Sequence, residues 1–292
     1  MSGRGAADLR RLIARPGCVL APGVVDPLSA RLVKEAGFEI VYMGGNATTA
    51  VRLGMADVGL LTLTEVADHA RRIDEAAGLP LLIDADNGYG NALNVRRAVR
   101  EFERAGVAGL HIEDQASPKR CGHFAGKQLI GAGEMVGKIK AALDARRDPD
   151  MVIIARTDAT AVDGFDAALE RASAYIEAGA DMLLMAPPLD LAQLEAAGRL
   201  GAPLLCPLDS TGLTPIAPAD DLASLGVKIG VFPTAIVMGI IPVVRRLLAA
   251  LKRDGTIAGI AGELASFDEY NALLGLAEFE ALERRAQGTE GD

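Results

Sequence analysis

Short apolar runs and longer helical stretches alternate along most of the chain. Each apolar run is only a few residues long, which is typical of a parallel strand buried on both faces. Several helical stretches end in Ala-Gly, where glycine can take the left-handed conformation that turns the chain toward the next strand. Strands are predicted at residues 19–25, 39–43, 79–85, 107–113, 151–156, 182–185, 203–208 and 227–232. Helices are predicted at residues 27–36, 63–77, 93–105, 133–145, 165–178, 191–197 and 234–253.

Successive strand–helix units predict an α/β fold of the (β/α)8 TIM-barrel type, with residues 1–292 as a single barrel domain. A doubly wound open sheet is the alternative. No Gly-x-Gly-x-x-Gly follows the first strand, so a dinucleotide-binding fold has no support. Residues 262–287 are additional to these units and are predicted to form a C-terminal helical extension. Such an extension would cover the barrel or pack on a neighbouring subunit.

The composition narrows the class of protein. The 292 residues carry a net charge of −9 and no tryptophan, which argues against nucleic acid as a partner. No apolar run reaches the roughly 18 residues of a membrane span, and no apolar segment follows the N-terminal arginines as in a secretory signal. The chain has only three cysteines, an odd number, and they lie far apart in the sequence: Cys18, Cys121 and Cys206. This pattern fits a reducing cytoplasm. We therefore expect a cytoplasmic protein that binds neither membranes nor nucleic acid.

In barrel enzymes the catalytic groups lie at the carboxyl ends of the strands. Strands two to five of the prediction end in polar or charged residues, whereas the last three predicted strands end in Ala186-Pro187, Pro207 and Pro233. The charged groups are therefore expected on one half of the rim. The polar strand ends are Tyr42-Met43-Gly44-Gly45-Asn46, Asp84-Ala85-Asp86-Asn87, His111-Ile112-Glu113-Asp114 and Arg156-Thr157-Asp158.

Asp84 and Asp86 are two residues apart, which would place both side chains on the same side of a strand. Two carboxylates that close repel each other unless a cation or a proton joins them. With Glu113 they form an oxygen cluster suited to Mg²⁺, which could hold a bidentate 2-hydroxy or 2-keto acid. The alternative is that the acids cap the helix that begins near Asn91.

The segment Pro118-Lys119-Arg120-Cys121-Gly122-His123 places a thiol between cations in a loop. Cations beside a thiol lower its pKa, and a partly ionised thiol suits a proton donor or a nucleophile. A zinc site formed by Cys121 and His123 lacks a second pair of ligands, and an inert buried thiol does not match the polar surroundings. We therefore predict an enzyme in which Cys121 carries chemistry.

Three other groups each have a functional and a structural interpretation. Arg156 could bind a substrate carboxylate or form an ion pair with an acid of the rim. Gly44 and Gly45 could offer backbone amides to an anion or form a simple tight turn. His111 is as consistent with a core position as with a functional one, and His69 is predicted to lie on the surface.

Four of these segments together resemble the isocitrate lyase/phosphoenolpyruvate mutase superfamily. Lys-Arg-Cys-Gly-His is similar to the motif of the carbon–carbon lyases of the methylisocitrate lyase and 2,3-dimethylmalate lyase branch. Phosphonate enzymes and oxaloacetate decarboxylases of the superfamily generally lack this cysteine. The segments, in order over roughly residues 10 to 260, are Tyr42-Met43-Gly44-Gly45, Asp84-Ala85-Asp86-Asn87-Gly88-Tyr89-Gly90, His111-Ile112-Glu113-Asp114-Gln115 and Lys119-Arg120-Cys121-Gly122-His123.

The resemblance implies a barrel whose last helix is exchanged between subunits and a homotetramer built from two such dimers. It implies Mg²⁺, with Mn²⁺ as an alternative, and a small hydroxy or keto acid as substrate. It also implies that a mobile loop carrying Cys121 closes over that substrate. The implied metal ligands are Asp84, Asp86 and Glu113, with Asp57 nearby. The implied catalytic residues are Cys121, Tyr42, Glu113 and Arg156, and the implied substrate-binding residues are Tyr42, Gly44, Gly45, Asp84, Gly122, His123 and Arg156.

The implied chemistry is a retro-aldol (Claisen-type) cleavage of a 2-hydroxy di- or tricarboxylate to a 2-keto acid and a carboxylate. Cys121 would protonate the carbanion as a general acid. Three positions depart from methylisocitrate lyases: Gly44 replaces a serine, Ala186 aligns with a glutamate, and Pro207-Leu208-Asp209-Ser210 replaces an asparagine and the polar residues after it. These departures favour a smaller or more apolar substrate, such as a 2-alkylmalate.

Two other functions remain as alternatives at this point. One keeps the fold and the metal but decarboxylates or hydrolyses oxaloacetate, or acts on a phosphonate. The other is a non-catalytic metabolite-binding protein, motivated by Ala186 and Pro207. The substitution Cys121→Ser separates the lyase from the decarboxylase, because decarboxylation needs only the metal and a keto acid.

Overall fold

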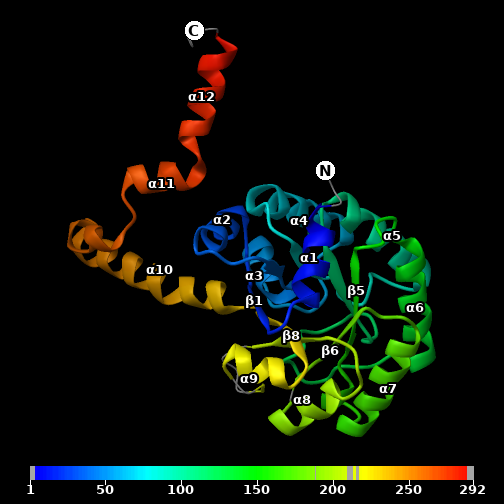
Figure 1. The fold of residues 1–292 in the computed structure, drawn as a ribbon. Coiled ribbons are helices and arrows are strands. Elements are labelled where there is room, and N and C mark those ends of the chain that lie inside the picture. Colours follow the sequence, from blue (N-terminus) through cyan, green and yellow to red (C-terminus); the bar gives the residue numbers. More distant parts are fainter. Residues whose placement is uncertain (1–3, 188, 209–212, 215–216, 288–292) are drawn as a thin grey trace. The chain divides into compact units, whose positions relative to one another are not determined.

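The computed structural model describes residues 4–187, 189–208, 213–214 and 217–287. Its parallel strands form an eight-stranded sheet in the order β1-β8-β7-β6-β5-β4-β3-β2 (Figure 1). β1 pairs with β8, and a bridge between Gly23 and Tyr42 links the chain after β1 to β2, so the barrel is nearly closed. The expected TIM-type fold is confirmed. The strands are β1 (Val19–Pro22), β2 (Val41–Met43), β3 (Leu81–Asp84), β4 (Gly109–Glu113), β5 (Val152–Thr157), β6 (Met182–Met185), β7 (Leu204–Pro207) and β8 (Val227–Phe232).

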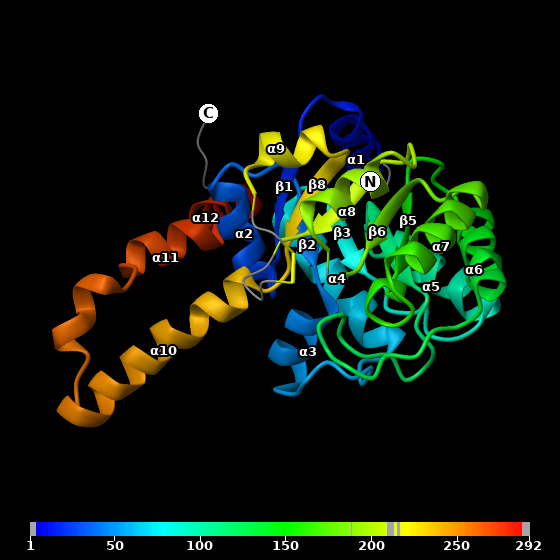
Figure 2. The same ribbon diagram turned by 90° about the horizontal axis from the view of Figure 1, so that it is seen from below.

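Helices surround the strands, and α5, α6 and α7 line one side of the barrel wall (Figures 1 and 2). Each predicted helix is present with ends that agree to within a residue or so. The prediction missed α1, α3 and α9. The helices that precede α10 are α1 (Arg4–Ala14), α2 (Pro27–Glu35), α3 (Gly45–Leu53), α4 (Leu63–Ala77), α5 (Ala92–Arg104), α6 (Ala132–Ala145), α7 (Phe165–Glu177), α8 (Leu191–Gly198) and α9 (Ala219–Ser224), with a 3₁₀ turn at Ala159–Ala161.

Two buried apolar clusters hold the barrel together. The larger one lies between strands and helices and includes Phe102 and Tyr175, both fully buried. The smaller one is built from side chains of the strands and from Leu9 of α1. Because Leu9 belongs to the same cluster as Val152 and Ile154, the missed N-terminal helix is part of the barrel core.

Local signals explain where the helices begin and end. Thr62 and Glu65 form a reciprocal capping box at the start of α4. Gly106 follows α5 with φ of +87°, and a Cβ there would lie 2.2 Å from a carboxylate oxygen of Asp74. Only glycine fits this turn, which leads directly into β4 and its acidic end.

One expectation about a helix surface is wrong. His69 on α4 is buried rather than exposed. Its Nε2 lies 2.9 Å from the carbonyl oxygen of Val25, and its Nδ1 lies 3.3 Å from Arg52 Nη1. A polar side chain on the inner face of α4 therefore found partners outside its own helix, which local periodicity does not reveal.

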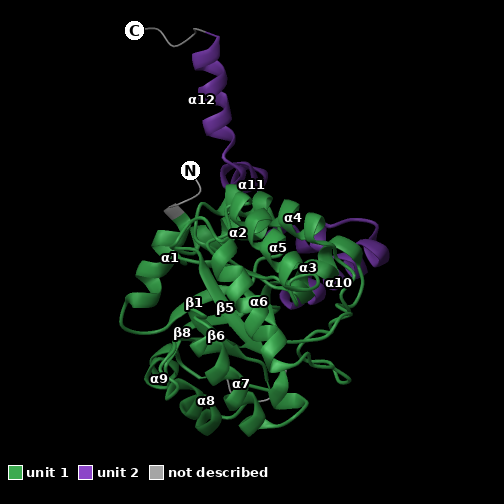
Figure 3. Ribbon diagram, turned by 90° about the vertical axis from the view of Figure 1, so that its right-hand side faces the viewer, with its two compact units in different colours: residues 1–237 green, residues 238–292 purple. Residues whose placement is uncertain are grey.

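The chain divides into two compact units, residues 1–237 and 238–292 (Figure 3). The second contains most of α10 (Ala235–Asp254), a 3₁₀ segment at Ala258–Glu263, α11 (Phe267–Leu274) and α12 (Leu276–Ala286). The expected C-terminal extension is therefore helical but broken into pieces. Exchange of a helix between subunits stays a prediction. Among the described helices, none has the length and apolar character needed to cross a membrane.

Candidate active site

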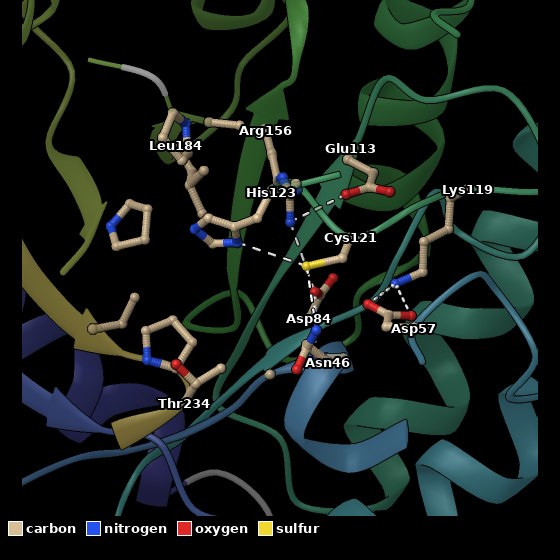
Figure 4. Close-up of a pocket in the computed structure, with 18 of the residues that line it drawn as sticks. Asn46, Asp57, Asp84, Glu113, Lys119, Cys121, His123, Arg156, Leu184 and Thr234 are labelled. Atoms are coloured by element: carbon tan, nitrogen blue, oxygen red, sulfur yellow. Dashed lines mark hydrogen bonds and ion pairs between the residues drawn. The ribbon is translucent and has the colours of Figure 1, made fainter. Parts of the chain in front are cut away.

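A pocket lies at the carboxyl ends of the strands, where the sequence places the polar groups (Figure 4). It encloses about 580 Å³ of space not filled by protein atoms, part of it open to solvent. One wall is charged and the other is mostly apolar. The lining residues are Tyr42, Gly44, Gly45, Asn46, Asp57, Asp84, Glu113, Lys119, Arg120, Cys121, Gly122, His123, Arg156, Leu184, Ala186, Pro187, Pro207, Val231, Pro233 and Thr234.

Nearly all the site residues expected from the sequence line this pocket. Asp86 is the exception, because it lines a smaller adjoining cavity together with Asp57 and Asp84. Asp86 does not continue strand β3 but takes a left-handed backbone conformation with φ of +49°. The expectation that Asp84 and Asp86 project from the same side of one strand is therefore wrong, although both side chains reach the same buried cluster. Asp209 and Ser210 lie outside the described residues.

Four buried carboxylates meet two buried cations in this cluster. The Nζ of Lys119 lies 2.8 Å from Asp57 and 2.5 Å from Asp86. The Nη1 of Arg156 lies 3.1 Å from Glu113 and 3.7 Å from Asp84. The acids are not helix caps, because α5 is capped by Asn91 instead. Four carboxylates against two cations leave the cluster short of positive charge.

The pKa values in the cluster follow from burial and from these cations. Burial, opposed by Lys119 and reinforced by Asp84, raises the pKa of Asp86 to about 6. Burial also raises the pKa of Glu113 well above its usual range, despite the opposing charge of Arg156. For Asp84, burial is outweighed by His111, Lys119 and Arg156, so its pKa is lowered. Burial therefore makes ionisation of Asp86 and Glu113 less favourable than in water, and a further cation would favour it.

Arg156 forms the ion pair that was the structural alternative for it. Its Nε and Nη2 donate to the two oxygens of Asp158 at 2.9 and 3.2 Å. Together with the contact to Glu113, this arrangement fixes the guanidinium at the pocket wall. The ion pair and a substrate-binding role are compatible, because the same side chain lines the pocket.

Cys121 lies on the loop between β4 and α6, residues 114–131, which we call the Cys121 loop. Its Sγ accepts a hydrogen bond from Asn46 Nδ2 at 3.4 Å and lies 3.7 Å from His123 Nδ1. Burial opposes ionisation of the thiol, but hydrogen bonds from the side chain and backbone of His123 outweigh it and lower the pKa of Cys121. The thiol is therefore poised for proton transfer.

The flanking cations, which the sequence predicts to lower the pKa of Cys121, are not the cause of the lowering. Lys119 turns away from the thiol to pair with Asp57 and Asp86. The lowering comes instead from His123. The direction of a lysine side chain depends on partners far away in the sequence, here a carboxylate 62 residues distant, which the motif alone does not specify.

Gly44 and Gly45 form the beginning of a helix rather than an isolated turn. Gly44 is the N-cap of α3, and the Gly45 amide donates to Asp84 Oδ2 at 3.4 Å. A helix N-terminus attracts negative charge, so the turn that the two glycines form is also a position where backbone amides could bind an anion. A Cβ on Gly45 would lie 3.1 Å from Asp84 and 3.2 Å from Lys119, which leaves little room for any other residue.

Tyr42 and His111 make a second buried contact under the pocket. The Tyr42 hydroxyl lies 2.9 Å from His111 Nε2, and His111 Nδ1 lies 3.5 Å from Asp84 Oδ1. Burial lowers the pKa of His111 to about 4, so the imidazole is neutral near pH 7. His111 does not line the pocket; it supports Tyr42, which does.

Sequence reasoning missed two kinds of lining residue. Asn46 follows a predicted strand, but nothing in the surrounding sequence indicates its hydrogen bond to Cys121. Leu184 on β6 and Thr234, which follows β8, give no chemical signal in the sequence. The apolar wall therefore required the three-dimensional structure.

Comparison with known proteins agrees with this geometry. A family model described as phosphoenolpyruvate phosphomutase matches residues 9–252. A crystal structure of 2,3-dimethylmalate lyase, described as a PEP mutase/isocitrate lyase superfamily member, superposes with a TM-score of 0.90 at 35% identity, covering 97% of this chain and 95% of that one. The chain belongs to this superfamily. The family expected from the four sequence segments is thus confirmed.

Relatives within the superfamily narrow the class further. The chain is 43% identical to 2,3-dimethylmalate lyase of Eubacterium barkeri over 95% of this chain and 96% of that protein. It is 39% identical to 2-methylisocitrate lyase of Escherichia coli over 88% of each. A phosphonopyruvate hydrolase structure titled as a complex with oxalate and Mg²⁺ matches at 30% identity with a TM-score of 0.87, covering 96% and 98%. The two named lyases confirm the expectation of a carbon–carbon lyase.

Proposed function

We propose that the protein is a Mg²⁺-dependent lyase that cleaves a 2-hydroxy dicarboxylate with alkyl substituents, of the 2,3-dimethylmalate type. The single observation that carries this substrate class is the division of the pocket into a charged wall and an apolar wall. Asp84, Glu113 and Arg156 lie on the first, whereas Leu184 and Ala186 lie on the second. A substrate with two carboxylates and small alkyl groups matches both walls, while a third carboxylate would face Ala186 without a partner.

The donor set fits a divalent cation. Glu113 Oε1 is buried and has no hydrogen-bond partner among the described residues. Asp84, Asp86 and Glu113, with Asp57 nearby, would hold Mg²⁺, and the shortage of positive charge around them would be relieved by it. Within the described part of the chain these groups are not yet arranged as a set of metal ligands, since Lys119 and Arg156 pair with them. Mn²⁺ is the alternative ion with the same oxygen preference.

When bound, Mg²⁺ acts as a Lewis acid that stabilises charge on the keto acid oxygens. The chain's own residues bind and orient the substrate. The helix N-terminus at Gly44 and Gly45 offers its positive end to a carboxylate, and Arg156 offers a guanidinium fixed by Asp158. Tyr42, held by His111, would contact the hydroxy-acid end of the substrate.

Cys121 supplies the proton that completes the cleavage. The proton of the substrate's 2-hydroxyl would pass to a carboxylate of the charged wall, and the hydroxyl oxygen would become the carbonyl oxygen of the keto acid as the bond between C2 and C3 breaks. The electron pair of that bond would stay on the carbon that bears the second carboxylate. The Cys121 Sγ–H would transfer its proton to that carbon, because its pKa is lowered by His123 and it faces the pocket. The Cys121 loop, which contributes to the pocket lining, would keep water away from the carbanion.

The experiment is an assay of keto-acid release from methylisocitrate, isocitrate, 2,3-dimethylmalate, citramalate and oxaloacetate, with Mg²⁺ and with EDTA. We expect metal-dependent release from 2,3-dimethylmalate, abolished in Cys121→Ser. Turnover of oxaloacetate alone, unchanged in Cys121→Ser, would overturn the lyase and favour the decarboxylase or hydrolase. Binding of oxalate with no turnover of any compound would favour a metabolite-binding protein.

The remaining expectations belong to the same proposal. A homotetramer is proposed, to be measured by light scattering of the full chain. A reducing cytoplasmic location is also proposed, and it is supported by three cysteines, Cys18, Cys121 and Cys206, that form no disulfide with one another.

A further inference from the structure

A buried ion pair under the Cys121 loop has no part in the chemistry described above. The Nζ of Lys127 lies 3.0 Å from Asp158 Oδ1, and both side chains are almost completely buried. Lys127 alone is buried in the stretch 124–128, whose other members are exposed. Burying a lysine requires the loss of its hydration, so a loop residue turned inward in this way indicates a specific contact.

The contact reaches the residue next to the catalytic thiol. The same Nζ of Lys127 donates a hydrogen bond to the carbonyl oxygen of Gly122. Lys127 therefore joins two parts of the Cys121 loop to a carboxylate at the end of β5. A charged donor makes these hydrogen bonds stronger than neutral ones.

Asp158 is fixed independently of Lys127. It accepts two hydrogen bonds from Arg156, and its backbone amide donates to Asp114 Oδ1 at 2.9 Å. Arg156 is shared among Asp158, Glu113 and Asp84, so Lys127 also contributes to neutralising Asp158. In addition, Lys127 links Asp158 to the loop that carries Cys121.

We propose that Lys127 is a positioning residue that holds the Cys121–Gly122 segment closed against Arg156 by bridging Gly122 and Asp158. Its effect on turnover rests on the proposed lyase function, but its effect on the loop does not. Without the bridge the loop would open more often, and the Cys121 side chain, now buried, would become accessible.

The test is the rate of alkylation of Cys121 by iodoacetamide in Lys127→Met, followed by mass spectrometry of each cysteine peptide. We expect the rate at Cys121 to rise about tenfold, which corresponds to about 1.4 kcal/mol. Cys206, buried in the core, serves as an internal reference and should not change. Lys127→Arg keeps a cation for Asp158 and should stay within about threefold of the native rate.

A matched control is Lys138→Met. Lys138 is another buried lysine, but its hydrogen bond goes to the carbonyl of Asn87 at 2.9 Å, which lies outside the Cys121 loop. An unchanged Cys121 rate in folded Lys127→Met overturns the proposal. Equal acceleration at Cys121 and Cys206, or equal acceleration in Lys138→Met, also overturns it, because either result reports general loosening. The assay needs no substrate, so its outcome is independent of whether the lyase assignment holds.

Discussion

The substitution Gly122→Ala tests how closely the Cys121 loop is fitted to the guanidinium of Arg156. A Cβ at residue 122 would lie 2.6 Å from Arg156 Nη2 and 3.5 Å from Asp158 Oδ1. Gly122 is not among the residues with positive φ, so the backbone itself accepts alanine. The change therefore adds one methyl group at the contact between loop and barrel and nothing else.

The magnitude follows from that distance. Ordinary contacts of a Cβ begin at 3.4 Å, so the 2.6 Å approach requires a displacement of about 0.8 Å. Arg156 cannot yield easily, because Asp158 and Glu113 hold it on both sides. The loop must move instead, and Cys121 moves with it. A misplacement of about 1 Å can lower a rate by about 100-fold, so we expect kcat/KM to fall by about 10- to 100-fold.

The assay is keto-acid release from the best substrate, with thermal unfolding measured in parallel. Gly133→Ala is the matched control, because a Cβ there meets nothing within 4 Å and the residue lies in the first turn of α6. We expect the control to keep native kcat/KM and to gain roughly 0.5–1 kcal/mol of stability. Native kcat/KM in Gly122→Ala would refute the close fit between loop and guanidinium. A large drop in its melting temperature would refute the claim that the effect is confined to the site.

Three further predictions concern metal binding, pH and packing. Mg²⁺ at about 100 times its Kd should stabilise the native protein by about 2.7 kcal/mol in thermal shift assays, and Glu113→Gln should remove most of that shift; an equal shift in both proteins would exclude Glu113 as a ligand. Burial raises the pKa of Asp74 to about 6 in the folded state, so its stabilising contribution, complete below about pH 4, is lost as pH rises through 6. Asp74→Asn should therefore raise stability by about 1 kcal/mol near pH 7.5, after allowance for its partial exposure, and leave it unchanged near pH 4; melting curves at both values would show equal effects if the reasoning fails. Phe102→Ala, at a fully buried position, should reduce the free energy of unfolding by about 3–5 kcal/mol in urea titration, and a loss under 1 kcal/mol would contradict the packing described.

The parts of the molecule that the sequence predicts well are those set by short-range rules. Strands such as Met182–Met185 and Val227–Phe232 agree at both ends, because a buried parallel strand is a short and mostly apolar run. The acids at the strand ends follow for the same reason. A strand pattern fixes which residues reach the rim, and the barrel topology then brings the rim residues together.

The missed helices had weak or misleading local signals. α3 begins at glycine and contains two threonines, which are poor helix formers. In the structure both hydroxyls bond back within the helix, Thr48 to the Gly44 carbonyl and Thr49 to the Gly45 carbonyl. The arginines of α1 hide its apolar face in the sequence, although Leu9 is fully buried. Tertiary packing, rather than propensity, stabilises these segments.

The charge partners of the site residues cannot be predicted from the local sequence pattern. The motif around Cys121 places lysine and arginine beside the thiol, yet His123 is what lowers its pKa. Lys119 is committed to Asp57 and Asp86, and Lys127, which carries no recognisable motif, reaches back to Gly122. Two lysines of one loop therefore have different partners. Lys119 neutralises the acids that would hold a metal, and Lys127 links the loop to the end of β5. Because binding of a divalent cation would compete with Lys119 but not with Lys127, the loop can stay anchored while the charge beneath it changes.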